Sequence, residues 1–374
     1  MKTEILTMLT QSDGYVSGQA LCDRLGVSRT AVWKVINQLK EEGYEIESVT
    51  GKGYRITGRP DRITAEEIAS RLNTDWAARS VRYFDSIDST NNEAKRLAEQ
   101  GAPHGTLVVA EEQTQGKGRR GRTWVTPAGT AIAMSLILRP EEASSPDNTV
   151  GSASDRCKTA GEPLHPDRAP MLTLVMGMAV ASACREVCGF TSTVSTHCEQ
   201  DESPILTGTA LDGAAPSIGI KWPNDVVAKG RKICGILTEM SCEVDFINYV
   251  VIGIGINTAI DEFPPELQET AVSLHTLMGS KPDRAKLIAA CMKAFERYYT
   301  LFMKTQDYSL LMAEYNELLV GKGGRVRVLS PGNEFEGISE GIDPMGELLV
   351  RREDGTTEAI FAGEVSVRGI YGYV

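Results

Sequence analysis

Strand-like and helix-like runs alternate through the middle of this 374-residue chain. The strand-like runs are short and rich in apolar and β-branched residues, as in GTLVVAEEQ, AIAMSLILRP and YVVIGIGINT. The helical stretches are longer, as in STNNEAKRLAEQ, MLTLVMGMAVASACREV and PDRAKLIAACMKAFERYYTLFM. Because such a chain buries its strands in a sheet covered by helices, we expect an α/β or α+β body over residues 61–320.

The first 60 residues have a different pattern. In GVSRTAVWKVINQLK the apolar residues recur at helical spacing, Ser28 can cap the start of the helix, and Gly43 follows its end. A shorter amphipathic stretch, SGQALCDRL, precedes it across a turn at Gly26. The following YEIESVTGKGYRI predicts two short strands around residues 51–53. Residues 1–60 are therefore expected to form a winged helix-turn-helix.

The second helix of this domain has an outward face without acidic residues. No Asp or Glu lies between Ser28 and Lys40, although the whole chain has a formal net charge of -11. Residues 1–60 carry eight Lys/Arg against seven Asp/Glu, and the remainder carries 31 against 43. We expect this face to bind DNA, because a face without carboxylates does not repel the phosphate backbone. The residues expected to contact DNA are Arg29, Thr30, Trp33, Lys34 and Asn37. For Trp33, DNA contact and packing against the wing both remain open.

The C-terminal residues change to short strands and tight turns. GGRVRVLS, EFEGISEGID, GELLVRRED and TEAIFAGEVSVRG predict a small all-β module over residues 321–374. Two other stretches fit no pattern. Residues 141–170 contain four prolines, with only Val150 and Leu164 as large apolar residues, and residues 191–217 contain no Lys or Arg. Both are expected to be mobile surface insertions, and a partner-binding role remains open for them.

Cysteine usage and hydropathy indicate a cytoplasmic protein with no membrane partner. No uninterrupted apolar run reaches the roughly 18 residues that span a bilayer, and the N-terminal residues lack the apolar core of a signal peptide. The eight cysteines are scattered without a CxxC pair, which favours free thiols. Cys184, Cys188, His197 and Cys198 fit no common zinc spacing.

A basic, glycine-rich loop lies between two predicted strands. GKGRRGRTW, residues 116–124, places four cations among three glycines. Glycines let a backbone approach a ligand closely, and Lys and Arg add charge-assisted bonds to phosphate or carboxylate oxygens. The loop lacks the P-loop pattern, and GIGIN at residues 253–257 lacks the third glycine of a dinucleotide fingerprint. An arginine-rich hairpin exposed to solvent would have the same composition.

Two further motifs carry polar side chains at the ends of predicted strands. DSIDSTNNEA places Asp88 and the three residues after it at a strand-to-helix junction, where they can cap the helix or bind a polar ligand. IKWPNDV places Lys221 at a strand end before a turn, and RKICGILTEM predicts another strand. Each of these features alone has an ordinary structural explanation.

In this order, the motifs resemble the bifunctional biotin protein ligases that also repress the biotin operon. The matching motifs are GVSRTAVWKVI, DSTN, GKGRRGRTW, KWPND, KICGILTE, IGIGIN and the C-terminal GEVSVRG. The resemblance covers nearly the whole chain outside the two insertions. It implies an α+β protein with an N-terminal winged helix-turn-helix (1–60), a class II synthetase-like ligase domain (61–320) and a small SH3-like β-barrel (321–374).

The resemblance also implies a two-step reaction. Biotin and ATP give biotinyl-5'-adenylate and pyrophosphate, with Mg²⁺ on the phosphates, and a lysine of the biotin carboxyl carrier protein of acetyl-CoA carboxylase then takes the biotin. Because two anions must meet, the site has to neutralise and align both. The adenylate is expected to act as corepressor, promoting a homodimer that binds operator DNA.

The resemblance assigns roles residue by residue. Those expected to bind biotin are Ser89, Thr90, Asn91, Gln113, Lys117, Gly118, Arg119 and Lys221. Those expected on the nucleotide side are Gly116, Arg122, Trp124, Asn224 and Asn257. Lys221 is expected to stabilise charge in the transition state, and Arg119 to hold the adenylate. Lys117 departs from the family, in which arginine is common, so it keeps the charge without the bidentate geometry.

Three other functions are alternatives to this one. A ligand-sensing transcription factor without catalysis is disfavoured because Lys221 and the basic loop are both present. A lipoate or other acyl ligase would not combine a winged helix with this loop. A ligase with a vestigial N-terminal domain is disfavoured by the acid-free helix face.

Overall fold

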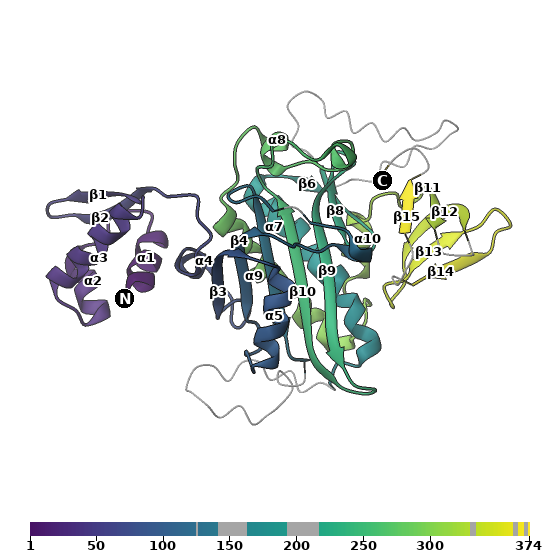
Figure 1. The fold of residues 1–374 in the computed structure, drawn as a ribbon, viewed down its shortest axis with the longest axis horizontal. Helices are drawn as coiled ribbons and strands as arrows, with labels where there is room; N and C mark the ends of the chain where they lie inside the picture. Colours follow the sequence, from purple (N-terminus) through teal and green to yellow (C-terminus); the bar gives the residue numbers. More distant parts are fainter. Residues whose placement is uncertain (125, 141–162, 193–216, 330–333, 362–365, 370–372) are drawn as a thin grey trace.

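The N-terminal part of the protein is a winged helix with its own apolar core. The computed structural model describes residues 1–124, 126–140, 163–192, 217–329, 334–361, 366–369 and 373–374, in three parts that follow the chain (Figure 1). Helices α1 (Lys2–Thr10), α2 (Gly18–Leu25) and α3 (Arg29–Glu41) precede the antiparallel pair β1 (Glu45–Val49) and β2 (Gly53–Gly58). Ser28 caps α3, and Gly26 turns the chain with a φ of 65°. The predicted winged helix is confirmed.

Helix α4 (Ala65–Arg71) joins this domain to the central body, and it contacts both α1 and α9. Glu67 of α4 is buried and forms ion pairs with Arg59 and Arg71. Arg71 in turn lies 3.1 Å from Asp283, the residue that caps α9. Charges therefore connect the winged helix to the body, which is consistent with the cost of leaving a buried carboxylate unpaired.

The central body is built on a mixed eight-stranded sheet. Its strand order is β3-β4-β5-β10-β9-β8-β7-β6, with β3/β4 and β6/β7 parallel and the other neighbours antiparallel. The strands are β3 (Val81–Ile87), β4 (Leu107–Gln113), β5 (Ala131–Leu138), β6 (Thr191–Ser192), β7 (Ser217–Lys221), β8 (Asp225–Ala228), β9 (Arg231–Cys242) and β10 (Ile247–Asn257).

Helices cover both faces of this sheet. On one face, α5 (Thr90–Glu99) buries Ala94 and Ala98 against strand residues such as Val108. On the other, α7 (Leu172–Cys188) and α9 (Arg284–Thr305) form the main core with residues such as Val109. Side chains alternate across a strand, so Val108 and Val109 belong to different faces. The shorter elements are η1 (Arg119–Gly121), η2 (Pro166–Met171), η3 (Pro265–Leu267), α8 (Leu274–Met278) and α10 (Met312–Leu318).

One helical segment in the described part of the chain is apolar enough to cross a membrane by length and composition. It runs from Pro166 to Cys188, and 67% of its most apolar window is buried inside the protein. Its position between the sheet and α9 accounts for its hydropathy, since a helix covered on several sides has no polar face to expose.

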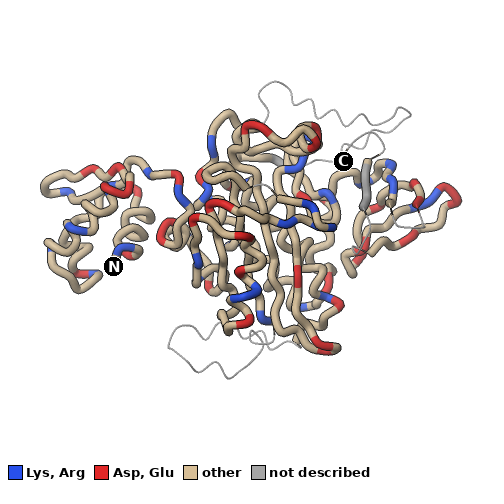
Figure 2. Tube along the Cα trace, viewed as in Figure 1, with Lys and Arg blue, Asp and Glu red and all other residues tan. Residues whose placement is uncertain are grey.

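The C-terminal part is a five-stranded antiparallel sheet in the described residues. Its strands are β11 (Arg325–Leu329), β12 (Phe335–Ile342), β13 (Leu348–Arg351), β14 (Thr357–Ile360) and β15 (Ser366–Gly369), in the order β14-β13-β12-β11-β15. The predicted small all-β module is confirmed. Figure 2 shows basic and acidic residues in each of the three parts.

The expectation of surface insertions is wrong for part of one stretch. Residues 163–170 belong to the body, where Leu164 and Ala169 are each 1% exposed and lead through η2 into α7. A few apolar anchors suffice to dock a short segment, and a composition averaged over thirty residues does not detect them. Of the other stretch, Thr191 and Ser192 form strand β6 beside β7. Residues 141–162 and 193–216 lie outside the described residues.

Candidate functional site

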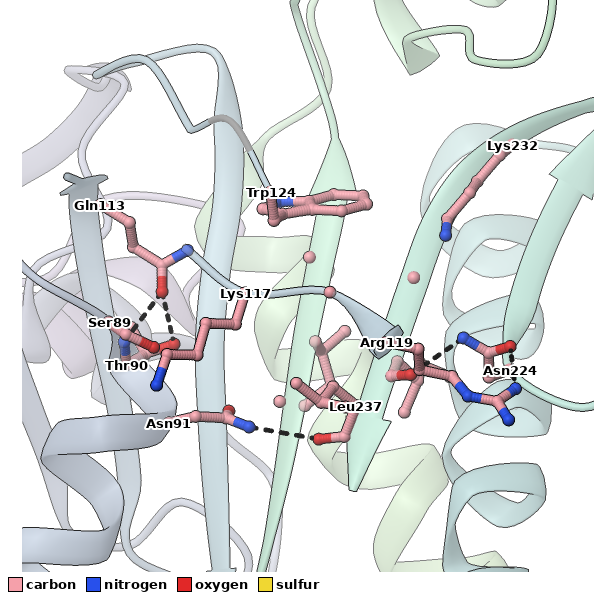
Figure 3. Close-up of a pocket in the computed structure, with 16 residues that line it drawn as sticks. Ser89, Thr90, Asn91, Gln113, Lys117, Arg119, Trp124, Asn224, Lys232 and Leu237 are labelled. Carbon is pink, nitrogen blue, oxygen red and sulfur yellow. Dashed lines mark hydrogen bonds between the residues drawn. The ribbon is translucent and has the colours of Figure 1, made fainter. Parts of the chain in front are cut away.

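A pocket opens on the face of the sheet that carries α5. Figure 3 shows Ser89, Thr90, Asn91 and Gln113 on one side of it, Arg119 and Asn224 on the other, and Trp124 between them. The pocket is lined by Ser89, Thr90, Asn91, Gln113, Lys117, Gly118, Arg119, Trp124, Asn224, Lys232, Gly235, Ile236, Leu237, Gly253, Ile254 and Gly255. Segments about 165 residues apart in sequence thus converge at one place.

The polar side of the pocket is held by hydrogen bonds at the start of α5. Gln113 Oε1 accepts hydrogen bonds from the Thr90 amide at 2.8 Å and from Thr90 Oγ1 at 3.0 Å. Ser135 Oγ lies 2.6 Å from Asn91 Oδ1, and Asn91 Nδ2 donates to Glu239 at 2.8 Å. These groups are fixed before any ligand arrives, which lowers the cost of binding.

Glu239 is the charged member of this network. Burial opposes its ionisation, but hydrogen bonds from Lys95 and Asn91 outweigh burial and hold its pKa below the usual value. The carboxylate therefore remains an acceptor at neutral pH and fixes the orientation of the Asn91 amide.

Glycines form the floor of the pocket. A Cβ on Gly253 would lie 2.1 Å from Asn91 Oδ1, and one on Gly255 would lie 2.3 Å from the Trp124 ring. A Cβ on Gly235 would lie 2.8 Å from Lys232 Nζ. The side chains of Asn91, Trp124 and Lys232 therefore pack directly on the backbone of these strands, and glycine leaves room for them because it has no Cβ.

The basic loop folds back on itself above this floor. The Gly118 amide donates to the Arg122 carbonyl at 2.7 Å, and the Trp124 amide donates to the Gly116 carbonyl at 2.9 Å. Arg119 Nη1 donates to Asn224 Oδ1 at 3.0 Å, and burial lowers the pKa of its guanidinium. Lys117 Nζ instead donates to Asn92 Oδ1 at 3.0 Å. The loop thus presents one cation on each side of the pocket.

Four predicted site residues do not line the pocket. Gly116 is buried against the Trp124 carbonyl, and Arg122 is exposed on the loop. Asn257 is buried and donates to the carbonyls of Lys232 and Val272. Lys221 ends strand β7, where its Nζ lies 4.3 Å from the centre of the Tyr373 ring.

Lys232 is a pocket cation that the sequence did not single out. It lies 2.6 Å from Asp225 and 5.4 Å from the Trp124 ring centre. The motifs KICGILTE and IGIGIN contain Lys232 and the floor glycines, but only strand pairing reveals that Gly235 faces Gly255. Within each strand the sequence shows only which residues share a face, because successive side chains point to opposite faces.

The predicted DNA-facing residues lie together on α3. Arg29, Thr30, Trp33 and Lys34 are exposed, and Asn37 is half-buried. Trp33 is 56% exposed, so packing against the wing does not cover it. Opposite them, Val32, Val35, Ile36 and Leu39 are buried in the core of the domain.

Three protein families match separate parts of the chain. Residues 2–55 match the HTH domain, residues 83–154 and 158–257 match the biotin/lipoate A/B protein ligase family, and residues 323–368 match the biotin protein ligase C terminal domain.

Similar proteins span almost the whole chain. The bifunctional ligase/repressor BirA of Bacillus subtilis is 34% identical over 98% of this chain and 98% of its own. The protein of the same description from Escherichia coli is 27% identical over 97% of this chain and 96% of its own. The structure of biotin protein ligase from Aquifex aeolicus in complex with biotin and ATP is similar in fold, with a TM-score of 0.58 at 24% identity, over 78% of this chain and 99% of that one.

Proposed function

Because the chain belongs to the family of bifunctional biotin ligases and repressors, we propose that it joins biotin to a carrier protein and represses biotin synthesis genes. The observation that carries the ligase function is the pocket, in which fixed polar groups lie on one side and a half-buried arginine on the other. A ligand with a neutral hydrogen-bonding head and an anionic tail fits this distribution.

Biotin has these two ends. Its ureido ring can bond with Ser89, Thr90 and Gln113, while Leu237 and Gly253 offer an apolar surface to its ring and chain. Its carboxylate would then lie toward Arg119. In the first step a carboxylate oxygen attacks the α-phosphate of ATP, and pyrophosphate leaves. In the second, a lysine amine of the carrier attacks the acyl carbon, and AMP leaves.

Arg119 has a position suited to both steps. A second cavity of ≈ 240 Å³ shares Arg119, Asn224, Ile236 and Leu237 with the first, so the arginine lies between the two. We propose that carboxylate and phosphate meet there and that the guanidinium, already partly desolvated, stabilises the negative charge of the adenylate. Lys221 is proposed to join them from the end of β7.

The remaining assignments are proposals of the same kind. Lys117, Gly118 and Asn91 would bind biotin, while Gly116, Arg122, Trp124, Asn224 and Asn257 would shape the nucleotide side. In the described residues no group of three His, Cys, Asp or Glu could hold a metal. Mg²⁺ usually binds through substrate phosphates and one or two carboxylates, and we propose that it would bind here with the phosphates of ATP, where it would neutralise charge.

The repressor function is supported by the exposed face of α3. We propose that biotinyl-5'-adenylate acts as corepressor by favouring a homodimer that presents two such faces to palindromic operator DNA. A winged helix with a net charge of only +1 over residues 1–60 gives weak electrostatic attraction by itself, so pairing two of them is a useful switch. We propose that the protein acts in the cytoplasm, without a membrane partner.

The central test is the exchange of labelled pyrophosphate into ATP. Exchange that requires biotin, and does not occur with lipoate, is expected. Biotin transfer to the carboxyl carrier protein of acetyl-CoA carboxylase should follow. Absence of exchange with biotin overturns the ligase function. For repression, a mobility shift on biotin-gene operator DNA should strengthen when biotin and ATP are added, and equal affinity with and without them overturns the corepressor.

A further inference from the structure

The side chain of Asn91 lies across three strands of the sheet. It packs on Gly253 of β10, where a Cβ would overlap Asn91 Oδ1. Gly253 pairs with Ser135 of β5 on one side and with Leu237 of β9 on the other, so these three residues form one row. The Asn91 amide spans this row from Ser135 to Leu237 (Figure 3). Glu239 follows two positions along β9 and therefore lies on the same face.

The chemistry of its neighbours allows the Asn91 amide only one orientation. On the β9 side, Asn91 Nδ2 lies 3.3 Å from the Leu237 carbonyl and 2.8 Å from Glu239 Oε2. Carbonyl and ionised carboxylate oxygens only accept hydrogen bonds, so the amide nitrogen must face them. Asn91 Oδ1 consequently faces Ser135 Oγ at 2.6 Å, and the single proton of the serine hydroxyl must point to it.

The same reasoning applies to Gln113 on the other side of Thr90. Gln113 Oε1 accepts from the Thr90 backbone amide, which can only donate. Thr90 Oγ1 lies 3.0 Å from Gln113 Oε1 and 2.8 Å from Ser135 Oγ. The hydroxyls of Thr90 and Ser135 thus have two protons for three contacts, one of which already serves Asn91. When the Thr90 proton turns to Ser135, Gln113 Oε1 can accept from an N–H group of a ligand.

Glu239 and Ser135 stand behind this polar wall. Asn91 and Thr90 line the pocket, whereas Glu239 and Ser135 are not among the described residues that line it. Ser135 is 0% exposed, and the second oxygen of Glu239 accepts from Lys95 Nζ at 2.8 Å. Any effect of these two residues on a ligand must therefore pass through Asn91 and Thr90.

We propose that Glu239 is a positioning residue that sets the donor and acceptor pattern of the polar wall. Because it accepts from the Asn91 amide, Ser135 must donate to Asn91, and the wall is left with acceptors for a ligand that carries N–H groups. The ureido ring of biotin carries two such groups. A dithiolane ring carries none and would leave the acceptors unpaired. This inference rests on the proposed function and deepens it, since it concerns how the same pocket selects biotin.

The test is calorimetric titration of biotin into variants of the whole protein. Glu239→Leu removes the acceptor, so the Asn91 amide can turn over, and the Kd for biotin should rise about tenfold. Glu239→Gln keeps one oxygen that can accept from Asn91, so its Kd should stay within about threefold of the wild type. Glu243→Leu makes the same change at an exposed glutamate beyond the end of β9 and should leave the Kd unchanged.

A cycle with Asn91→Ala separates positioning from a merely structural effect. Without the amide, Glu239→Leu should change the Kd by less than about twofold. Ser135→Ala removes the donor on the other side of the amide, so it should raise the Kd severalfold alone and little in the Asn91→Ala background. If Glu239→Leu does not fold, the Ser135→Ala cycle decides by the same criterion.

The outcomes separate this inference from the proposed function. A Kd that Glu239→Leu leaves unchanged, or raises as much without the Asn91 side chain as with it, overturns the inference. A Glu239→Gln variant as weak as Glu239→Leu also overturns it, because the acceptor oxygen is then not what matters. A wild type that does not bind biotin instead removes the proposed function itself.

Discussion

Replacing Gly253 by alanine tests the close approach on which the pocket depends. The added Cβ would lie 2.1 Å from Asn91 Oδ1, whereas a carbon and an oxygen normally stay about 3.3 Å apart, so Asn91 must move by roughly 1 Å. The φ of Gly253 is outside the left-handed region, so alanine itself causes no backbone strain. The whole effect should come from the displaced asparagine.

The magnitude follows from the contacts that Asn91 loses. Its amide donates to the ionised Glu239 at 2.8 Å, and its carbonyl oxygen lies 2.6 Å from Ser135 Oγ. A buried hydrogen bond contributes about 1 kcal/mol, and one to a charged group about 1.5–3 kcal/mol. We therefore expect Gly253→Ala to lower the free energy of unfolding by about 2–4 kcal/mol and to weaken biotin binding.

The assays are urea unfolding and calorimetric titration with biotin. Gly177→Ala is the matched control, because its added Cβ would meet Ile220 at an ordinary 3.7 Å inside helix α7. It should be neutral or stabilising by up to about 1 kcal/mol.

A double-mutant cycle isolates the clash. In an Asn91→Ala background the side chain that obstructs the new Cβ is gone, so Gly253→Ala should cost little further stability. Equal costs of Gly253→Ala in both backgrounds would refute the reasoning.

Three further perturbations address other parts of the protein. Arg119→Ala should release biotinyl-5'-adenylate faster in a chase experiment, by about tenfold or more if one charge-assisted bond is lost, whereas an unchanged rate means that another group holds the adenylate. Lys34→Ala should reduce the slope of log operator affinity against log salt by about 1 without altering pyrophosphate exchange, and an unchanged slope would remove Lys34 from the DNA contacts. Burial lowers the pKa of His104 to about 4, so the unfolded chain gains a proton near pH 6.5 that the folded protein does not take up until about pH 4. The stability of the folded protein should therefore fall as pH drops through this window, by up to about 3 kcal/mol, and urea unfolding of His104→Asn should lack this component of the decline.

The sequence predicted the elements whose signals are local. Helix α3 has its apolar residues at helical spacing, and the residues so identified are those that the fold buries. Ser89 and Thr90 could be singled out because a helix start leaves a short motif, whereas Gln113 was assigned only through the family resemblance. The anchors Leu164 and Ala169 were missed, because two apolar residues in a polar stretch have no periodicity.

The glycine floor could not be predicted in the same way. Gly235 and Gly255 are twenty positions apart, and their meeting depends on the register of β9 against β10. A one-residue shift of that register would move each glycine opposite an isoleucine or Cys234 and turn the pairing to the other face. The close approach of Trp124 to Gly255 thus depends on strand pairing, and the GIGIN motif alone does not predict it.

The positions of the two lysines near the pocket could not be predicted from sequence motifs either. Lys221 and Lys232 are both strand residues, and motif position favours Lys221, yet the pocket wall contains Lys232. Asp225 holds Lys232, and Tyr373 contacts both Asp225 and Lys221, so the arrangement of the cations depends on a residue almost 150 positions further along the chain. Motif position therefore identifies a strand that carries a lysine, but it does not decide which of the two lysines lines the pocket.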